Sequence, residues 1–81
     1  MQMQFLFPFL SSSSFYEGQR VRYIGAGVEI KVGETGTIVK LLMRKSMAVD
    51  WDISGFARHN CRGCARDGHG WVVCQSNVEP E

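Results

Sequence analysis

Short runs of alternating apolar and polar residues, separated by turn-forming residues, most constrain the fold of this chain. Met47, Val49 and Trp51 occupy every second position of one such run. Side chains of a strand point alternately to the two faces of a sheet, so this run predicts a half-buried strand. Residues 40–47 alone have apolar spacing that suits a helix, but β-branched residues precede them and this alternation follows at once. The pattern therefore predicts an all-β domain.

Several further runs of similar length predict the rest of the sheet. The stretch 35–42 is apolar on both sides, as expected of a central strand, and should pair with residues 47–52 across a turn at 43–46. Residues 28–32 fit a short strand or an extended loop, and Gly33 and Gly36 mark a turn after them. The predicted strands, in chain order, are residues 18–24, 35–42, 47–52, 71–74 and 78–80.

Five short strands in a chain of 81 residues predict a small SH3-like barrel. A long loop rich in cysteine, histidine and glycine should precede the fourth strand. Residues 75–77 should form a tight turn, and Pro80, which cannot donate a backbone hydrogen bond, should end the last strand at an edge of the sheet.

The sequence divides into an N-terminal tail, residues 1–16, and a domain, residues 17–81. The tail joins an apolar run to four serines, which form a flexible joint. No Lys or Arg precedes Arg20 and Pro8 interrupts the run, so the pattern fits neither a signal peptide nor a membrane span. We expect a tail that packs on the domain or is disordered; the alternative is a segment that adds a strand or mediates self-association. No membrane partner is expected.

The net charge and the number of cysteines argue against two classes of protein. Nine Lys and Arg residues against eight Asp and Glu residues leave a net charge of +1, so the whole chain carries no basic field for nucleic acid. Three cysteines cannot all pair within one chain, which argues against a secreted disulfide scaffold. A reducing compartment fits better, and we expect the protein in the cytoplasm.

Residues 56–74 hold all three cysteines and both histidines. Cys61 and Cys64 have the spacing of a zinc knuckle, Cys74 follows ten positions later, and His59 or His69 completes a Cys₃His ligand set. The competing interpretation is three unligated thiols, with Cys61 and Cys64 close to a disulfide under oxidation and Cys74 buried in its strand as a small apolar side chain. We expect no cofactor, with zinc as the alternative.

A series of motifs defined mainly by glycine and tryptophan spacing runs through residues 18–80. They are Gly18-x-x-Val21, Gly33-x-x-Gly36-Thr37-Ile38-Val39, Val49-Asp50-Trp51-Asp52, His59-Asn60-Cys61, Gly68-His69-Gly70-Trp71-x-Val73 and Val78-Glu79-Pro80. Their order resembles that of small SH3-like proteins of phages and prophages of Gram-positive bacteria, over residues 18–79. It is similar, more distantly, to KOW-type modules, whose turn and strand match residues 33–39. The resemblance implies an SH3-like fold and a binding module without chemistry, in a bacterial host cell.

A binding module is the predicted function, and catalysis is not. So small a barrel offers no deep pocket, and no acidic residue is spaced to orient a histidine beside a cysteine. Asp50 and Asp52 are interpreted as a solvated face. The predicted partner is a protein, and the resemblance implies a bacterial host factor that the module modulates. The candidate binding residues, mainly aromatic and basic, are Tyr23, Phe56, Arg58, His59, Arg62, Arg66, His69 and Trp71.

Nucleic acid is the alternative partner. Lys40, Arg44 and Lys45, together with the arginines of the cysteine-containing loop, would form a local basic patch for phosphates, with aromatic side chains stacking on bases. The neutral total charge favours the protein partner. A zinc-stabilised interaction domain is the third alternative.

Overall fold

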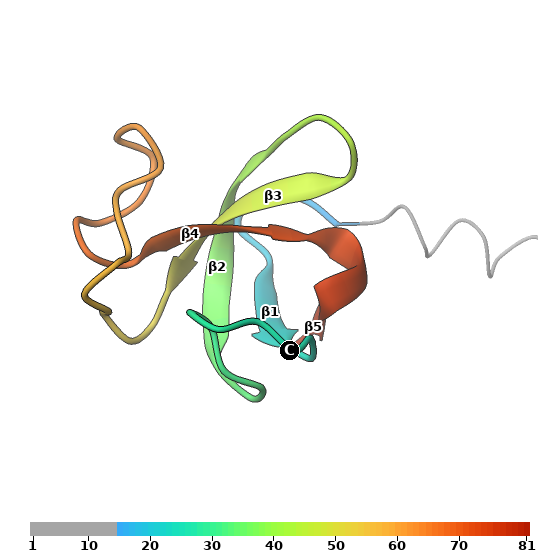
Figure 1. Ribbon diagram of the computed structural model, residues 1–81. Helices are drawn as coiled ribbons and strands as arrows, with labels where there is room; N and C mark the ends of the chain where they lie inside the picture. Colours follow the sequence, from blue (N-terminus) through green and yellow to red (C-terminus); the bar gives the residue numbers. More distant parts are fainter. Residues whose placement is uncertain (1–14) are drawn as a thin grey trace, which may run out of the picture.

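The structure is a computed structural model that describes residues 15–81, and the predicted tail lies outside it except for Phe15 and Tyr16. The described part contains five strands and no α-helix, which confirms the prediction of an all-β domain (Figure 1). No helix in this part is long and apolar enough to cross a membrane. The elements are β1 (Arg20–Tyr23), β2 (Thr35–Leu41), β3 (Ser46–Trp51), β4 (Gly70–Cys74), the 3₁₀ turn η1 (Gln75–Asn77) and β5 (Val78–Pro80).

The strands form a single antiparallel sheet in the order β4-β3-β2-β1-β5. The predicted central hairpin is confirmed, because β2 pairs with β3 from Gly36 opposite Trp51 to Leu41 opposite Met47. The register shifts once, between Ile38 and Lys40, where an irregularity bends β2. Both strands at the edges, β4 and β5, pair with one neighbour only, so backbone hydrogen bonds among residues 15–81 do not close the sheet into the predicted barrel.

The segment between β1 and β2 is an extended loop, which decides between the two alternatives for residues 28–32. The alternation of the sequence does not hold there, since of Val28, Ile30 and Val32, which would share one face of a strand, only Ile30 is buried. The backbone N–H of Gly33 donates to the carbonyl of Tyr23, and Gly33 has a φ of 96°, a conformation that costs a glycine little. This loop therefore inserts one apolar side chain into the core without joining the sheet.

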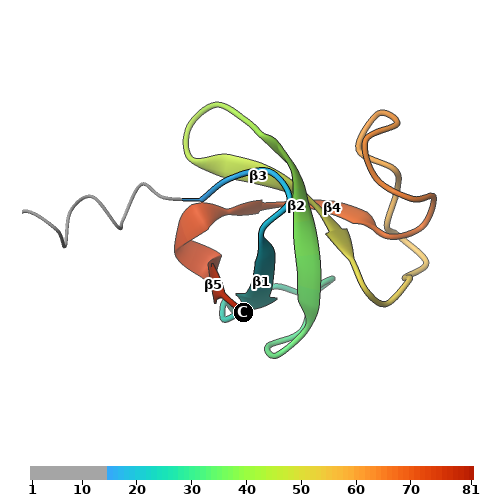
Figure 2. The ribbon, with the colours of Figure 1, turned by 180° about the vertical axis from the view of Figure 1, so that it is seen from behind.

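The core lies on the concave side of the bent sheet, where β1 and β5 face β3 and β4 (Figures 1 and 2). Trp51 is fully buried at its centre, and the ring of Tyr23 meets it edge-on with 6.0 Å between ring centroids. The alternation of the sequence accounts for this side of β3, because Met47 and Val49 are also fully buried. Ala48 is buried too, on the opposite face, where the loop between β3 and β4 covers the sheet.

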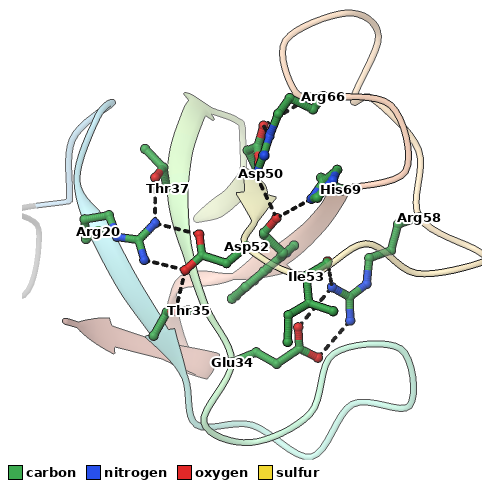
Figure 3. Close-up of polar contacts among 11 residues, drawn as sticks. Arg20, Glu34, Thr35, Thr37, Asp50, Asp52, Ile53, Arg58, Arg66 and His69 are labelled. Atoms are coloured by element: carbon green, nitrogen blue, oxygen red, sulfur yellow. Dashed lines mark hydrogen bonds and ion pairs between the residues drawn. The ribbon is translucent and has the colours of Figure 1, made fainter.

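Asp52 follows β3 and belongs to an ion-pair cluster on the outside of the sheet (Figure 3). Arg20 Nη1 donates to Asp52 Oδ1 at 2.8 Å, and the Thr35 hydroxyl donates to Asp52 Oδ2 at 2.6 Å. The hydrogen bonds from Arg20, opposed by partial burial, lower the pKa of Asp52 from 3.8 to about 2. Asp52 is thus exposed, as predicted, but it is engaged by residues of two other strands.

Acid should destabilise the domain through this carboxylate. A folded-state pKa below the unfolded value gives stabilisation that is complete above about pH 4 and is lost as the pH falls through about 2. The expected size is about 1 kcal/mol, because the Asp52 side chain is 40% exposed and solvent screens the pair. Urea unfolding at several pH values should therefore show a smaller acid dependence for Asp52→Asn than for the unaltered chain. Equal slopes for the two proteins would contradict this assignment.

Candidate binding groove

The loop between β3 and β4, residues 52–69, is the predicted cysteine- and histidine-rich loop, and it is fastened to the sheet at its base. Gly70 exchanges two backbone hydrogen bonds with His59, with N···O distances of 2.6 and 2.9 Å. The backbone N–H of Trp51 donates to the carbonyl of His69, and His69 Nδ1–H donates back to the carbonyl of Trp51 at 2.8 Å. The two ends of the loop are therefore held together beside β4.

Arg66 fixes the far side of the loop to the outer face of β3. Its guanidinium and backbone N–H both donate to the carboxylate of Asp50, with Nη2 to Oδ1 at 2.8 Å (Figure 3). These hydrogen bonds, against partial burial, lower the pKa of Asp50. Asp50 is only 14% exposed at its side chain, so its interpretation as a solvated face is wrong. The reason is that the loop folds back over the strand and supplies the partner.

Arg58 is buried beneath the loop and is not available to a partner. It is 9% exposed and lies between two loops, where its guanidinium donates to the Glu34 carboxylate and to the carbonyl of Ile53 (Figure 3). The guanidinium also donates to the Glu29 carboxylate. Its side chain therefore links the loop after β1 to the loop after β3. Arg58 was predicted to contribute to a binding surface, and in the structure its guanidinium is engaged by two acidic residues that are distant in sequence.

The tip of the loop is a tight turn that carries Cys61 and Cys64. The carbonyl of Asn60 accepts from the N–H groups of Gly63 and Ala65, and Cys64 N–H donates to the carbonyl of Cys61. Cys61 and Arg62 have φ angles of 51° and 62°, in the left-handed region that costs residues with a Cβ roughly 1–2 kcal/mol each. The packing of the loop against the sheet sustains this conformation and points the tip across the outer face of β3 and β4.

A groove of about 380 Å³ lies between this tip and the outer face of the sheet. The tip and the β2–β3 hairpin rise on the same side of β3 and β4 in both views (Figures 1 and 2). Ala48 and Val72 are paired across β3 and β4, and Lys40 is paired with Ala48 across β2 and β3, so these three form one row along the floor. The full lining is Lys40, Leu42, Ala48, His59, Cys61, Arg62, Cys64 and Val72.

The charged side chains of the groove are both cationic. Among residues 15–81, the ion pairs involve Arg20, Arg22, Arg58 and Arg66, and Lys40 and Arg62 take part in none. Arg44 and Lys45, in the adjoining turn of the β2–β3 hairpin, are also outside these pairs. Six of the eight acidic residues are used by the paired arginines. The near-zero net charge therefore conceals a local excess of positive charge at the groove.

Among residues 15–81, the cysteines and histidines are not gathered into the Cys₃His set that was considered as the alternative to unligated thiols. Within residues 15–81, no three His, Cys, Asp or Glu side chains lie close enough to hold a metal ion. Cys61 packs against Gly70 at the start of β4, and Cys74 ends the same strand, roughly 13 Å away along an extended chain. His59 Nδ1 accepts a hydrogen bond from the backbone N–H of Cys61, with a distance of 2.9 Å.

The predicted burial of Cys74 is also wrong. Cys74 is exposed, because the period of a strand puts it on the outer face with Val72, whereas Val73 faces the core. Replacement of Cys74 by serine therefore leaves no buried hydroxyl, contrary to what burial implied. Cys61 is the more enclosed thiol, and burial raises its pKa.

Two of the eight candidate binding residues, His59 and Arg62, line the groove. Tyr23 is a core residue whose hydroxyl accepts from the N–H of Gly27. Trp71 is partly buried against the core, and its ring lies 5.6 Å from that of His59. Phe56 is fully exposed and is not among the lining residues. Arg58, Arg66 and His69 hold the loop in place, as described above.

The apolar floor was not predicted. Ala48 and Val72 occupy positions that the alternation assigns to the solvent face, and an apolar residue at such a position is a signal that something covers it. Leu42 follows the end of β2 and continues this apolar side of the groove. The sequence predicts Lys40 only as part of a basic patch, and the structure adds its place beside this floor.

Comparisons with known protein families, with curated proteins and with solved structures found no match to this chain.

Proposed function

We propose that this protein is a small, non-enzymatic binding module of the SH3-like type, and that it engages a protein partner through the groove. A meander of strands β1 to β4, followed by a 3₁₀ turn and a fifth strand that returns beside β1, is consistent with an SH3-like barrel. The resemblance to phage and prophage proteins supports a bacterial host factor as the partner, met in the host cytoplasm.

The observation that carries the proposal is the combination of an apolar floor with cationic side chains that form no ion pair within the described part of the chain. Ala48 and Val72 provide the floor, and Lys40 and Arg62 stand on opposite sides, one on β2 and the other on the loop tip. An apolar surface with a few polar groups is typical of recognition sites. Cationic side chains that form no ion pair with the described residues favour a partner of opposite charge.

A protein partner suits the groove better than a nucleic acid. Single-stranded nucleic acids are held by aromatic side chains on which the bases stack, and none of the lining residues is Phe, Tyr or Trp. The four cations outside the ion pairs around the groove and hairpin turn favour nucleic acid as the second candidate, through phosphate contacts alone. Binding of that kind would depend steeply on salt concentration.

The proposal is tested by capturing partner proteins from a bacterial lysate with the unaltered chain and with variants of the groove, and comparing what each recovers. The unaltered chain and Lys31→Gln, which removes a cation of the loop after β1, should recover the same protein. Lys40→Gln combined with Arg62→Gln should lose it, because both groove charges are gone. A protein recovered equally by all three would place the interaction elsewhere. Recovery of nucleic acid alone, with salt-dependent affinity for an oligonucleotide, would overturn the proposal in favour of the second candidate.

A further inference from the structure

We propose that the partner contributes an extended acidic segment that pairs with the open edge of β4 at Val72 and Cys74 and directs acidic side chains into the groove. This inference rests on the proposed function and names the kind of segment recognised. An extended segment added to a sheet edge gains affinity from backbone hydrogen bonds and specificity from alternate side chains.

The backbone register shows which groups of β4 face outward. Trp51 N–H donates to the carbonyl of His69, and Gln75 N–H donates to the carbonyl of Lys45, so the odd-numbered residues of this stretch bond to β3 and its continuation. Gly70 instead bonds to His59, on the other side of the strand. Antiparallel strands alternate in this way, so the N–H and C=O groups of Val72 and Cys74 point away from β3.

Within residues 15–81, a sixth strand position beside β4 is occupied only at its start. His59 fills it opposite Gly70, and the chain reaches His59 out of a turn in which Arg58 N–H donates to the carbonyl of Gly55. No other described segment forms a ladder with the outward side of β4. A partner strand that pairs with Val72 would continue, beside β4, the strand position that His59 occupies opposite Gly70. Unpaired edges of this kind are templates for strand addition.

The groove lies directly beside this edge and supplies the preference for acidic side chains. Val72 has its side chain in the groove, so the neighbouring residue of an added strand that faces the same way lies next to Arg62 and the cysteines of the loop tip. Lys40 lies in the same row, two strands further in. A carboxylate there would meet two cations and no acidic residue of the lining.

Charge complementarity also argues against occupants from this chain. Residues 1–14 contain no Asp or Glu, and β4 itself, with the sequence GWVVC, contains none. Neither the chain's own tail nor the β4 edge of a second copy would therefore neutralise Lys40 and Arg62. A separate acidic segment would.

Short synthetic peptides test this inference on the full chain. A blocked peptide of alternating valine and glutamate should bind at low salt and should protect the amides of Val72 and Cys74 from hydrogen exchange. The same peptide with lysine in place of glutamate should bind about tenfold more weakly or worse, because its charges are repelled. The glutamate peptide with methylated amide nitrogens keeps its charge but cannot donate to an edge, and should lose a similar factor. Arg62→Gln should weaken binding of the glutamate peptide, and Lys31→Gln should not.

Each other result counts against the inference. Equal binding of the methylated peptide would overturn edge pairing, and equal binding of the lysine peptide would overturn the acidic preference. Protection of Val72 and Cys74 that rises with protein concentration alone, or that disappears when residues 1–14 are removed, would assign the edge to a second copy or to the tail. A glutamate peptide that fails to bind would overturn this inference, whereas the lysate experiment tests the proposed function independently.

Discussion

Arg58→Met should lower the free energy of unfolding by about 3–5 kcal/mol, because it removes one partner of a buried ion-pair network and leaves the others. The Glu34 side chain is 11% exposed, and its carboxylate accepts from two nitrogens of Arg58. The carbonyls of Glu29 and Ile53 would lose the same donor. Burial alone raises the pKa of Glu34, but hydrogen bonds from Arg58 and from the Lys31 backbone bring it below its ordinary value. So small a domain has only a few kcal/mol of net stability, so the variant should be largely unfolded at room temperature.

Circular dichroism during urea unfolding measures this effect, and Arg22→Met is the matched control. Arg22 pairs with Glu79 on the surface, where the two side chains are 41% and 47% exposed, so its loss should cost less than about 1 kcal/mol. Arg58→Lys should fall between the two, since it keeps the charge but loses the planar fork that reaches several acceptors. Similar losses for Arg58→Met and Arg22→Met would show that the buried network contributes no more than a surface pair.

The strands could be predicted from the sequence because their signal is local. In β3, the buried residues Met47, Val49 and Trp51 occupy every second position, so the alternation of apolar and polar residues in the sequence is enough to predict their burial. The edge position of Pro80 follows in the same way from its missing N–H group. Closure of the sheet depends on strands that are distant in the sequence, so it has no local signal. The predicted barrel is not closed by hydrogen bonds, because β4 and β5 each pair with one neighbour only.

The roles of the arginines could not be predicted, because they depend on residues brought together by the fold. Arg58 bonds to Glu29 and Glu34, which lie 29 and 24 positions away. Composition counts charges as a total, whereas the structure pairs some of them, and Lys40 and Arg62 beside the apolar floor form no ion pair with any residue of 15–81. The groove therefore appears only once the loop is known to fold back over β3. The error over Cys74 was avoidable, since counting by twos from Val72 places it on the outer face.

Gly70→Ala should cost about 1–3 kcal/mol, the range for adding a methyl group where the packing leaves no room, and it should also displace the loop tip. A Cβ at this position would lie 2.7 Å from the carbonyl oxygen of His59 and 2.8 Å from Cys61 Sγ. The His59 carbonyl is backbone and accepts from Gly70 N–H at 2.6 Å, so it cannot move without breaking the contact that holds the loop to β4. The amide resonances of His59 and Cys61 should therefore shift, and their hydrogen exchange should accelerate.

Gly63→Ala is the control that distinguishes loss of the contact between Gly70 and His59 from a general increase of backbone strain in the loop. Gly63 lies in the same turn with a φ of 95°, and a Cβ there meets no atom within 4 Å, so its substitution should cost roughly 1 kcal/mol of backbone strain without moving the tip. Gly70→Ala should in addition weaken capture of the groove's partner, because Cys61 and Arg62 would no longer stand beside Val72. If Gly70→Ala proved no more costly than Gly63→Ala and left the exchange of His59 unchanged, the loop would not be clamped at Gly70. The position of the loop would then rest on the hydrogen bonds of Arg58, Arg66 and His69.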